Sequence, residues 1–293
     1  MRVGVAGYGK MGAAMAARLL ERGWEVIVWN RNLDVVRDAG LTFANSPRAL
    51  AAACQVVISS LFDADAVRAV YEGHDGLIAD EVDTLFIEMS TVGPASQRTL
   101  SAKVVACGGS FIECPVSGTT APARAGQLLG LAGGDCADID RARPVLEHLC
   151  RRIVHMGEVG AGARTKLAIN LPLIAFWQSF GEAMALMRSL DMEPDSLVEL
   201  FGDTAGAPAV LKLKAESVAS ALHGRDSVTP TFDIDSMRKD LQLMLAEASN
   251  EACSLPVANA VLQAMNEASS AGWGKRDCAW VPAYWAAKGE SAH

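Results

Sequence analysis

The sequence lacks the features that mark several large classes of protein. Its net charge is −8 and its Lys and Arg residues form no basic stripe, which argues against a nucleic-acid partner or a membrane surface. The most apolar later segment, 167–177, holds Asn170 and Pro172 and is too short to cross a bilayer. The N-terminal MRVGVAGYG is broken by glycines and makes a poor secretory signal. We therefore expect a cytoplasmic protein, or one of an organelle matrix.

The sequence also lacks the Cys and His patterns of metal sites and disulfide frameworks. Its seven cysteines are odd in number and form no C-x-x-C pair, and its five histidines show no ligand spacing. We expect free thiols and no metal. No internal repeat or low-complexity segment is present. With 293 residues, of which 51% are hydrophobic, the chain is long enough for roughly two domains.

Short apolar runs alternate with helix-like segments in the first half. Strands are predicted at 2–6, 25–29, 55–61, 84–90 and 110–117, and a helix at 11–22. This alternation predicts a parallel sheet covered by helices on both faces. From about Gly162 the texture changes to Ala-, Leu- and Met-rich helical segments at 163–190, 195–202, 208–223, 233–249 and 256–269.

The loop after the first strand, GVAGYGKMG, carries the pattern G-x-G-x-x-G at Gly7, Gly9 and Gly12. It follows a strand, opens a helix and precedes a second strand, the context in which this pattern indicates dinucleotide binding. Gly7 allows the tight turn, Gly9 lets the backbone approach a pyrophosphate, and Gly12 lets helix and strand pack closely. The phosphates would lie at the helix N-terminus, where unpaired N–H groups favour anions. A glycine-rich turn without a ligand is the alternative.

The end of the second strand bears on the choice of cofactor. An acidic residue there would bind the ribose 2′-hydroxyl of NAD, but the sequence has Asn30, Arg31 and Asn32. No carboxylate repels a 2′-phosphate, and Arg31 can pair with one. We therefore expect NADP, with NAD less favoured. The alternative is that Arg31 is only a solvated loop residue.

The fold class that follows is α/β. We expect an N-terminal Rossmann-type doubly wound sheet in residues 1–161 that binds NADP, followed by an all-α domain in 162–293 for the substrate and for dimerisation. The apolar helices after Leu167 predict a homodimer or a higher homo-oligomer. Trp177 is expected in the core or in the subunit interface.

Five motifs in order resemble those of the β-hydroxyacid dehydrogenases, the family of 3-hydroxyisobutyrate dehydrogenase and the glyoxylate/succinic semialdehyde reductases. They are GVAGYGKMG with the Asn30–Asn32 ending, EMSTVGP, ECPVSGTTAPARAGQLLGLAGG, GARTKLAIN and FDIDSMRKDLQLML, and GWGKRD resembles the closing segment. The likeness covers nearly the whole chain. It implies an NAD(P)-dependent enzyme with a C-terminal domain like that of 6-phosphogluconate dehydrogenase.

The resemblance assigns roles to particular residues. Lys166 matches the catalytic lysine and Asn170 its partner, while Ser117, Gly118 and Thr119 fall in the substrate-binding segment. Phe232 and Asp240 belong, with Lys239, to a motif that reaches back to the cofactor. The candidate cofactor-binding residues are Gly7, Tyr8, Gly9, Lys10, Met11, Gly12, Asn30, Arg31, Asn32, Leu61, Thr91 and Lys239.

The chemistry of hydride transfer suits these residue types. One cationic group that gives and takes a proton serves both reaction directions, and Lys166 is the candidate, although a lysine at a helix start is otherwise a solvated surface residue. Asn170, one helical turn later, would hold the substrate hydroxyl or the lysine amine. Ser117–Thr119 would bind the carboxylate of a small acid through N–H and hydroxyl groups.

The chain departs from the family pattern at three positions. Thr119 stands where glycine is usual, and Cys114, expected as a small buried filler, precedes the proline. Pro172 removes a helical hydrogen bond and favours a bend. The main hypothesis is an NADP-dependent oxidoreductase for a small β-hydroxy acid or its semialdehyde. The alternatives are an imine reductase, against which Lys166 counts, and a non-catalytic NADP-binding module.

Overall fold

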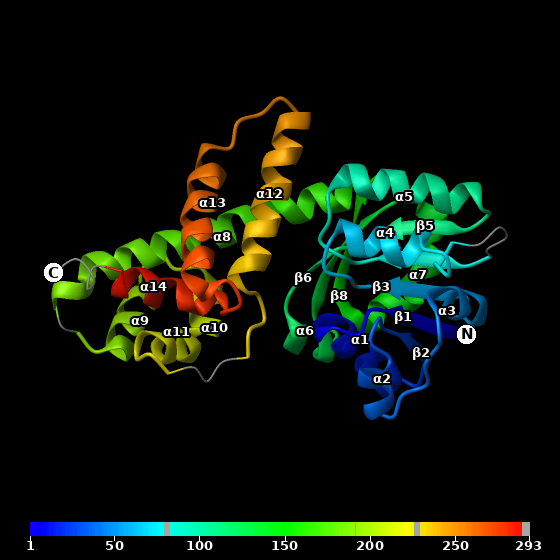
Figure 1. The fold of residues 1–293 in the computed structure, drawn as a ribbon, viewed down its shortest axis with the longest axis horizontal. Helices are drawn as coiled ribbons and strands as arrows, with labels where there is room; N and C mark the ends of the chain where they lie inside the picture. Colours follow the sequence, from blue (N-terminus) through cyan, green and yellow to red (C-terminus); the bar gives the residue numbers. More distant parts are fainter. Residues whose placement is uncertain (79–82, 191, 226–228, 289–293) are drawn as a thin grey trace. The chain divides into compact units, whose positions relative to one another are not determined.

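The computed structural model describes residues 1–78, 83–190, 192–225 and 229–288. The chain forms two compact units, Met1–Leu167 and Ala168–His293 (Figure 1). The first unit contains a sheet with strands on both sides of β3, and the second consists of helices. None of the helices within the described ranges is both long and apolar enough to span a bilayer.

The first unit is built on an eight-stranded sheet in the order β2-β1-β3-β4-β5-β7-β6, with β8 paired to β7. Its strands are β1 (Arg2–Ala6), β2 (Glu25–Trp29), β3 (Val56–Ser59), β4 (Leu85–Glu88), β5 (Ser110–Glu113), β6 (Val116–Ser117), β7 (Leu128–Gly133) and β8 (Cys150–Gly157). The strands from β2 to β5 are parallel. Strand β7 runs antiparallel to β5 and β6 and parallel to β8.

Helices cover both faces of this sheet, as the alternating pattern predicts. They are α1 (Lys10–Glu21), α2 (Asp34–Asp38), α3 (Pro47–Ala53), α4 (Ala64–Glu72), α5 (Pro94–Ala106), α6 (Thr120–Ala125) and α7 (Cys136–Leu149). Apolar side chains of α1, α6 and α7 form one buried layer, and those of α3, α4 and α5 form the other. Strands β3 and β4 are buried along their whole length, because both of their faces are covered.

The sheet differs from the expected one beyond β5. The expected strand at 110–117 is two strands, β5 and β6, because Pro115 lacks an N–H and interrupts the ladder between them. Strands β7 and β8 were not predicted, and β7 makes the sheet mixed rather than wholly parallel. Cys114 is fully buried in the core, which confirms its expected place as a small buried filler.

The second unit is helical, which confirms the expected fold class. Helix α8 (Ala161–Met187) begins in the first unit and runs through Pro172 into the second. The other elements are a 3-10 turn at Arg188–Leu190, α9 (Pro194–Gly202), α10 (Ala209–Leu213), α11 (Ala215–Leu222), α12 (Ile234–Asn250), α13 (Pro256–Ala268), a π turn at Ser269–Trp273, a 3-10 turn at Cys278–Trp280 and α14 (Val281–Ala287).

The helix boundaries agree with the pattern except at one place. The segment 208–223 forms two helices, α10 and α11, with a break at Lys214. Trp177 is fully buried, in agreement with a core position. Helices α12 and α13 pack side by side (Figure 1).

Candidate functional site

The glycine loop between β1 and α1 has the geometry of a phosphate cradle. Gly7 has φ of 98° and its N–H donates to the Trp29 carbonyl at 2.8 Å. A Cβ on Gly7 would lie 2.4 Å from the Ser60 carbonyl oxygen, and a Cβ on Gly12 would lie 1.9 Å from that of Gly7. A Cβ on Gly9 would meet nothing within 4 Å. The protein's own packing therefore requires glycine at 7 and 12, whereas the space beside Gly9 is open to a ligand.

The start of α1 suits an anion. Gly9 is its N-cap, no side chain of the described residues caps it, and its first turn contains no acidic residue. The first N–H groups of a helix have no partner within the helix, and the helix dipole favours negative charge there. The pyrophosphate of a dinucleotide fits this end without competition from a carboxylate.

Asn30 joins the glycine loop to the end of β2. Its Oδ1 accepts a hydrogen bond from the Tyr8 N–H at 3.1 Å, and its Nδ2 donates to the Asn32 carbonyl at 2.9 Å. Asn32 in turn accepts from the Asp34 N–H at 3.1 Å. Arg31, between Asn30 and Asn32 in the chain, has an exposed side chain. The asparagines therefore order the loop itself, and Arg31 remains the candidate for a 2′-phosphate.

A buried carboxylate that the sequence interpretation missed lies at the end of β4. Glu88 is fully buried and accepts hydrogen bonds from the Ser90 N–H at 3.0 Å, the Ser90 hydroxyl and Gln97 Nε2 at 2.6 Å. Burial raises its pKa, although these hydrogen bonds act in the opposite direction. The Ser90 hydroxyl oxygen also accepts from the Leu61 N–H at 2.8 Å. The network orders the segments that contain Leu61 and Thr91. The only sign of this network in the sequence is an acidic residue, Glu88, at the end of an apolar strand.

The expected substrate-binding segment follows β6. Gly118 has φ of 130°, and a Cβ there would lie 2.7 Å from Leu128 Cδ2, so glycine is needed. Thr119 is the N-cap of α6 but its side chain makes no capping hydrogen bond. Ser117 ends β6 and is partly buried. Two hydroxyls thus flank a turn that only glycine adopts easily.

The lysine and asparagine of the fourth motif both lie in α8. Lys166 belongs to the first unit and Asn170 to the second. Within the second unit, Asn170 Nδ2 donates to Asp240 Oδ2 at 2.8 Å, and Lys239 Nζ lies 3.0 Å from Asp240 Oδ1. Asn170 and Asp240 are both buried. The structure therefore brings together three of the residues that the family motifs single out.

A second missed carboxylate holds the segment before α12. Asp277, the last residue of GWGKRD, is fully buried and accepts from Lys214 Nζ at 2.6 Å and from the N–H groups of Thr231 at 2.7 Å, Phe232 at 3.3 Å and Ala279 at 3.0 Å. Burial disfavours its charge, but the hydrogen bonds outweigh this and hold its pKa below the usual value. Asp277 thereby fixes the backbone of Phe232 just before the N-terminus of α12.

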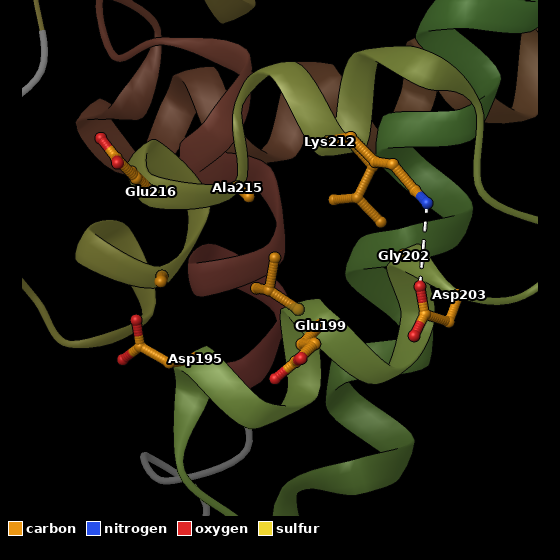
Figure 2. Close-up of a pocket in the computed structure, with 10 residues that line it drawn as sticks. Asp195, Glu199, Gly202, Asp203, Lys212, Ala215 and Glu216 are labelled. Atoms are coloured by element: carbon orange, nitrogen blue, oxygen red, sulfur yellow. Dashed lines mark ion pairs between the residues drawn. The ribbon is translucent and has the colours of Figure 1, made fainter.

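A cavity of about 320 Å³ lies between α9, α10 and α11 in the second unit (Figure 2). Figure 2 shows carboxylates around its rim and the ion pair of Lys212 Nζ with Asp203 Oδ1 at 3.7 Å. None of the candidate residues lines it. Among the described side chains, no group of three or more His, Cys, Asp or Glu has a metal-binding arrangement.

Comparison with known proteins agrees with this architecture. Residues 2–157 match the NAD binding domain of 6-phosphogluconate dehydrogenase, and residues 160–284 match the NAD-binding domain of NADP-dependent 3-hydroxyisobutyrate dehydrogenase. Glyoxylate/succinic semialdehyde reductase 1 of Arabidopsis thaliana is 33% identical over 94% of this chain and 96% of its own. The 3-hydroxyisobutyrate dehydrogenase of Mycobacterium tuberculosis, in a structure with L-serine, has a TM-score of 0.82 at 27% identity, over 96% of this chain and 97% of its own.

An imine reductase of Streptomyces aurantiacus shares the fold at 23% identity and a TM-score of 0.56, over 96% of this chain and 98% of its own. The glycine loop, the sheet and the matches together define an NAD(P)-dependent oxidoreductase. More particularly, the chain belongs to the β-hydroxyacid dehydrogenase family.

Proposed function

We propose that the protein is an NADP-dependent oxidoreductase acting on a small β-hydroxy acid or its semialdehyde, with Lys166 as general acid and base. The observation that carries the proposal is the place of Lys166, near the start of α8 and within the compact unit that contains the glycine loop. We propose that residues 1–161 form the NADP-binding domain and residues 162–293 the domain for substrate and dimerisation, with Lys166 and Asn170 at the reacting oxygen and Lys239 at the cofactor.

The proposed mechanism needs one proton for each hydride. When bound, the nicotinamide supplies or accepts the hydride. Lys166 Nζ donates a proton to the oxygen that gains negative charge during reduction, and removes it again during oxidation. Asn170, oriented by its hydrogen bond to Asp240, holds the substrate oxygen or the lysine amine. Because Asp240 also pairs with Lys239, its charge is balanced.

The proposed substrate class is a small carboxylate. The Arabidopsis relative is named for glyoxylate and succinic semialdehyde, two small molecules that each carry one carboxylate. The N–H and hydroxyl groups of Ser117–Thr119 are suited to binding such an anion. Arg31, exposed beside the glycine loop, supports NADP over NAD. Exposed apolar side chains on helices of the second unit, such as Leu186 and Leu213, support assembly as a homodimer or a larger homo-oligomer.

Replacing Lys166 with Ala tests the proposal. The variant K166A is expected to lose about 10²- to 10⁴-fold in kcat, the usual contribution of a positioned acid or base, while its Kd for NADPH, followed by fluorescence titration, stays unchanged. The matched control is R164A, which removes an exposed cation from the same helix and is expected to keep kcat. A K166A variant with the kcat of the unaltered protein would refute the assignment.

A substrate panel tests the reaction class. NADPH oxidation is followed with glyoxylate, succinic semialdehyde, methylmalonate semialdehyde and a cyclic imine, each at matched concentration. We expect turnover of at least one carboxylate aldehyde. Turnover of the imine alone would favour the imine reductase alternative, and NADPH binding without any turnover would favour a non-catalytic module.

A further inference from the structure

Glu113, the last residue of β5, has no part in the site described so far, yet it holds the start of the helix that carries Lys166. Its side chain is fully buried. Glu113 Oε1 accepts the N–H of Gly160 at 2.6 Å and that of Gly162 at 2.8 Å, and the carboxylate also accepts the N–H of Ala163. Its Oε2 is buried and has no hydrogen-bond partner among the described residues.

Two glycines allow the backbone to close around this carboxylate. A Cβ on Gly133 of β7 would lie 2.5 Å from Glu113 Oε1. A Cβ on Gly162 would lie 2.2 Å from the Leu131 carbonyl oxygen and 3.2 Å from Glu113 Oε1. The first turn of α8 is therefore packed directly against β5 and β7. A shift of the carboxylate would have to move the helix.

Glu113 lies between the two parts of the proposed site that belong to the first unit. Ser117 follows it by four residues along the chain. Lys166 comes three residues after Ala163, the last of the N–H donors, and three residues correspond to about 4.5 Å along a helix axis. One side chain therefore joins the segment expected to bind the substrate carboxylate to the helical turn that bears the proposed acid and base.

We propose that Glu113 is a positioning residue, which fixes the first turn of α8 against β5 and so holds the Lys166 ammonium in place for proton transfer. The inference rests on the proposed function of Lys166. Misplacement of a reacting group by about 1 Å costs on the order of 100-fold in rate. The effect of Glu113 is thus on kcat, and cofactor binding at the glycine loop is independent of it.

The charge of this positioning group changes near neutral pH. Burial raises the pKa of Glu113 to about 7, the hydrogen bonds from Gly160, Ala163 and Gly162 oppose this, and the charge of Glu88 adds to it. Glu88 faces Glu113 in register on β4. The ionised carboxylate is the stronger acceptor and interacts favourably with the helix dipole. Above pH 7 the ionised carboxylate therefore makes the stronger hydrogen bonds to the first turn of α8, although its burial lowers the stability of the folded chain.

Two other ionisable neighbours, Cys114 and Arg98, keep a constant charge in this range. Burial raises the pKa of the Cys114 thiol well above its ordinary value, so this neighbour stays neutral. Arg98 of α5 lies against Gly160, within 2.6 Å of where its Cβ would be, and a guanidinium keeps its charge at all relevant pH values. A change in kcat near pH 7 that depends on residue 113 thus reports Glu113 together with the buried Glu88 beside it, whose pKa is also raised.

The experiment compares the pH dependence of kcat in the unaltered protein and in E113Q, which keeps an acceptor oxygen but loses the charge. The ratio of the two kcat values cancels the ionisation of Lys166 and of the substrate, because both enzymes share them. We expect this ratio to rise from near one below pH 6 to about tenfold above pH 8, the difference between a charged and a neutral acceptor. The Kd for NADPH should agree within about twofold, since the cradle is unchanged.

The matched control removes another carboxylate cap from the same unit. Asp135 caps α7, where its Oδ1 accepts the Ala137 N–H at 2.8 Å, and α7 carries no candidate site residue. D135A is expected to keep kcat at every pH. A ratio for E113Q that stays flat with pH, or an equal fall of kcat in D135A, would overturn the proposal. K166A distinguishes a failure of the proposed function from a failure of the Glu113 proposal. If K166A keeps full kcat, both proposals fail. If K166A is inactive while E113Q matches the unaltered protein, only the role of Glu113 fails.

Discussion

Replacing Asp277 with Ala is expected to destabilise the second unit by about 3 to 5 kcal/mol, the usual cost of removing one partner of a buried ion pair. Asp277 is fully buried and the Lys214 side chain is 15% exposed. The substitution leaves the ammonium without a counter-charge and deprives the N–H groups of Thr231 and Ala279 of their acceptor.

The magnitude follows from these contacts. The partial exposure of Lys214 lets water reach the ammonium, which places the ion-pair contribution near the lower end, about 3 kcal/mol. Each backbone N–H left without an acceptor adds about 1 kcal/mol. Total stabilities of folded domains are about 5 to 15 kcal/mol, so this single side chain accounts for a large share.

Tryptophan fluorescence during urea denaturation measures the effect. Of the six tryptophans, Trp177, Trp273, Trp280 and Trp285 lie in the second unit, so the signal reports mainly on that unit. The control is D195N, which removes the carboxylate of an exposed pair with His223 at 2.9 Å and should leave the denaturation midpoint nearly unchanged. A loss in D277A below about 1 kcal/mol, or one no larger than in D195N, would refute the reasoning.

The pH dependence gives a second check with a defined sign. The pKa of Asp277 in the folded chain is lowered, so its contribution is present above the ordinary Asp value and is lost as the pH falls through the folded one. The difference in unfolding free energy between the unaltered protein and D277A should be constant from pH 5 to 8 and shrink below about pH 4.

Three further predictions concern the first unit. In G9A the new Cβ meets open space, so this variant should keep its denaturation midpoint and lose NADPH affinity. In G12A the new Cβ would lie 1.9 Å from the Gly7 carbonyl oxygen, so this variant should lose stability. Equal denaturation midpoints for the two variants would contradict this prediction. R31A should raise the Kd for NADPH by about tenfold, one lost charged contact, and leave the Kd for NADH unchanged in the same fluorescence titration. Because the pKa of Glu113 is raised from 4.5 to about 7, the unaltered protein should lose roughly 3 kcal/mol of stability relative to E113Q between pH 4.5 and pH 8; urea denaturation at a series of pH values that showed no such trend would disprove the buried charge.

The strands that could be predicted from the sequence are those that lie beside buried strands in the sheet. The limits of β1 and β2 agree with the apolar runs at 2–6 and 25–29, since each run begins at a charged residue and is followed by Gly7 or Asn30. Strand β7, LLGLAG, contains two glycines, which weaken any strand signal. Strand β8 carries exposed arginines. Both strands exist because of pairing with residues far along the chain, which a local pattern does not contain.

The same distinction explains which parts of the site could be predicted. The glycine loop is encoded within a few residues, so its turn and its helix start could be predicted directly. Glu113 receives its hydrogen bonds from residues 47 and 49 positions later, and Asp277 from Lys214, 63 positions earlier. No spacing rule connects such partners. The roles of Lys166, Asn170 and Ser117 stay predictions that depend on motifs and on the variants above.

The passage of α8 across the limit between the units has a consequence for hybrid proteins assembled from two relatives. A junction at Leu167 and Ala168 would join halves of different parents within a continuous helix, one residue after Lys166. A junction at Gly160 avoids this, because Glu113 binds main-chain N–H groups that any parent supplies unless it has proline there. Glycine is needed at 160, where φ is 105°, and at 162, where a Cβ would lie 2.2 Å from the Leu131 carbonyl oxygen. Exchange of cofactor and substrate preferences between relatives is therefore easiest just before α8 begins.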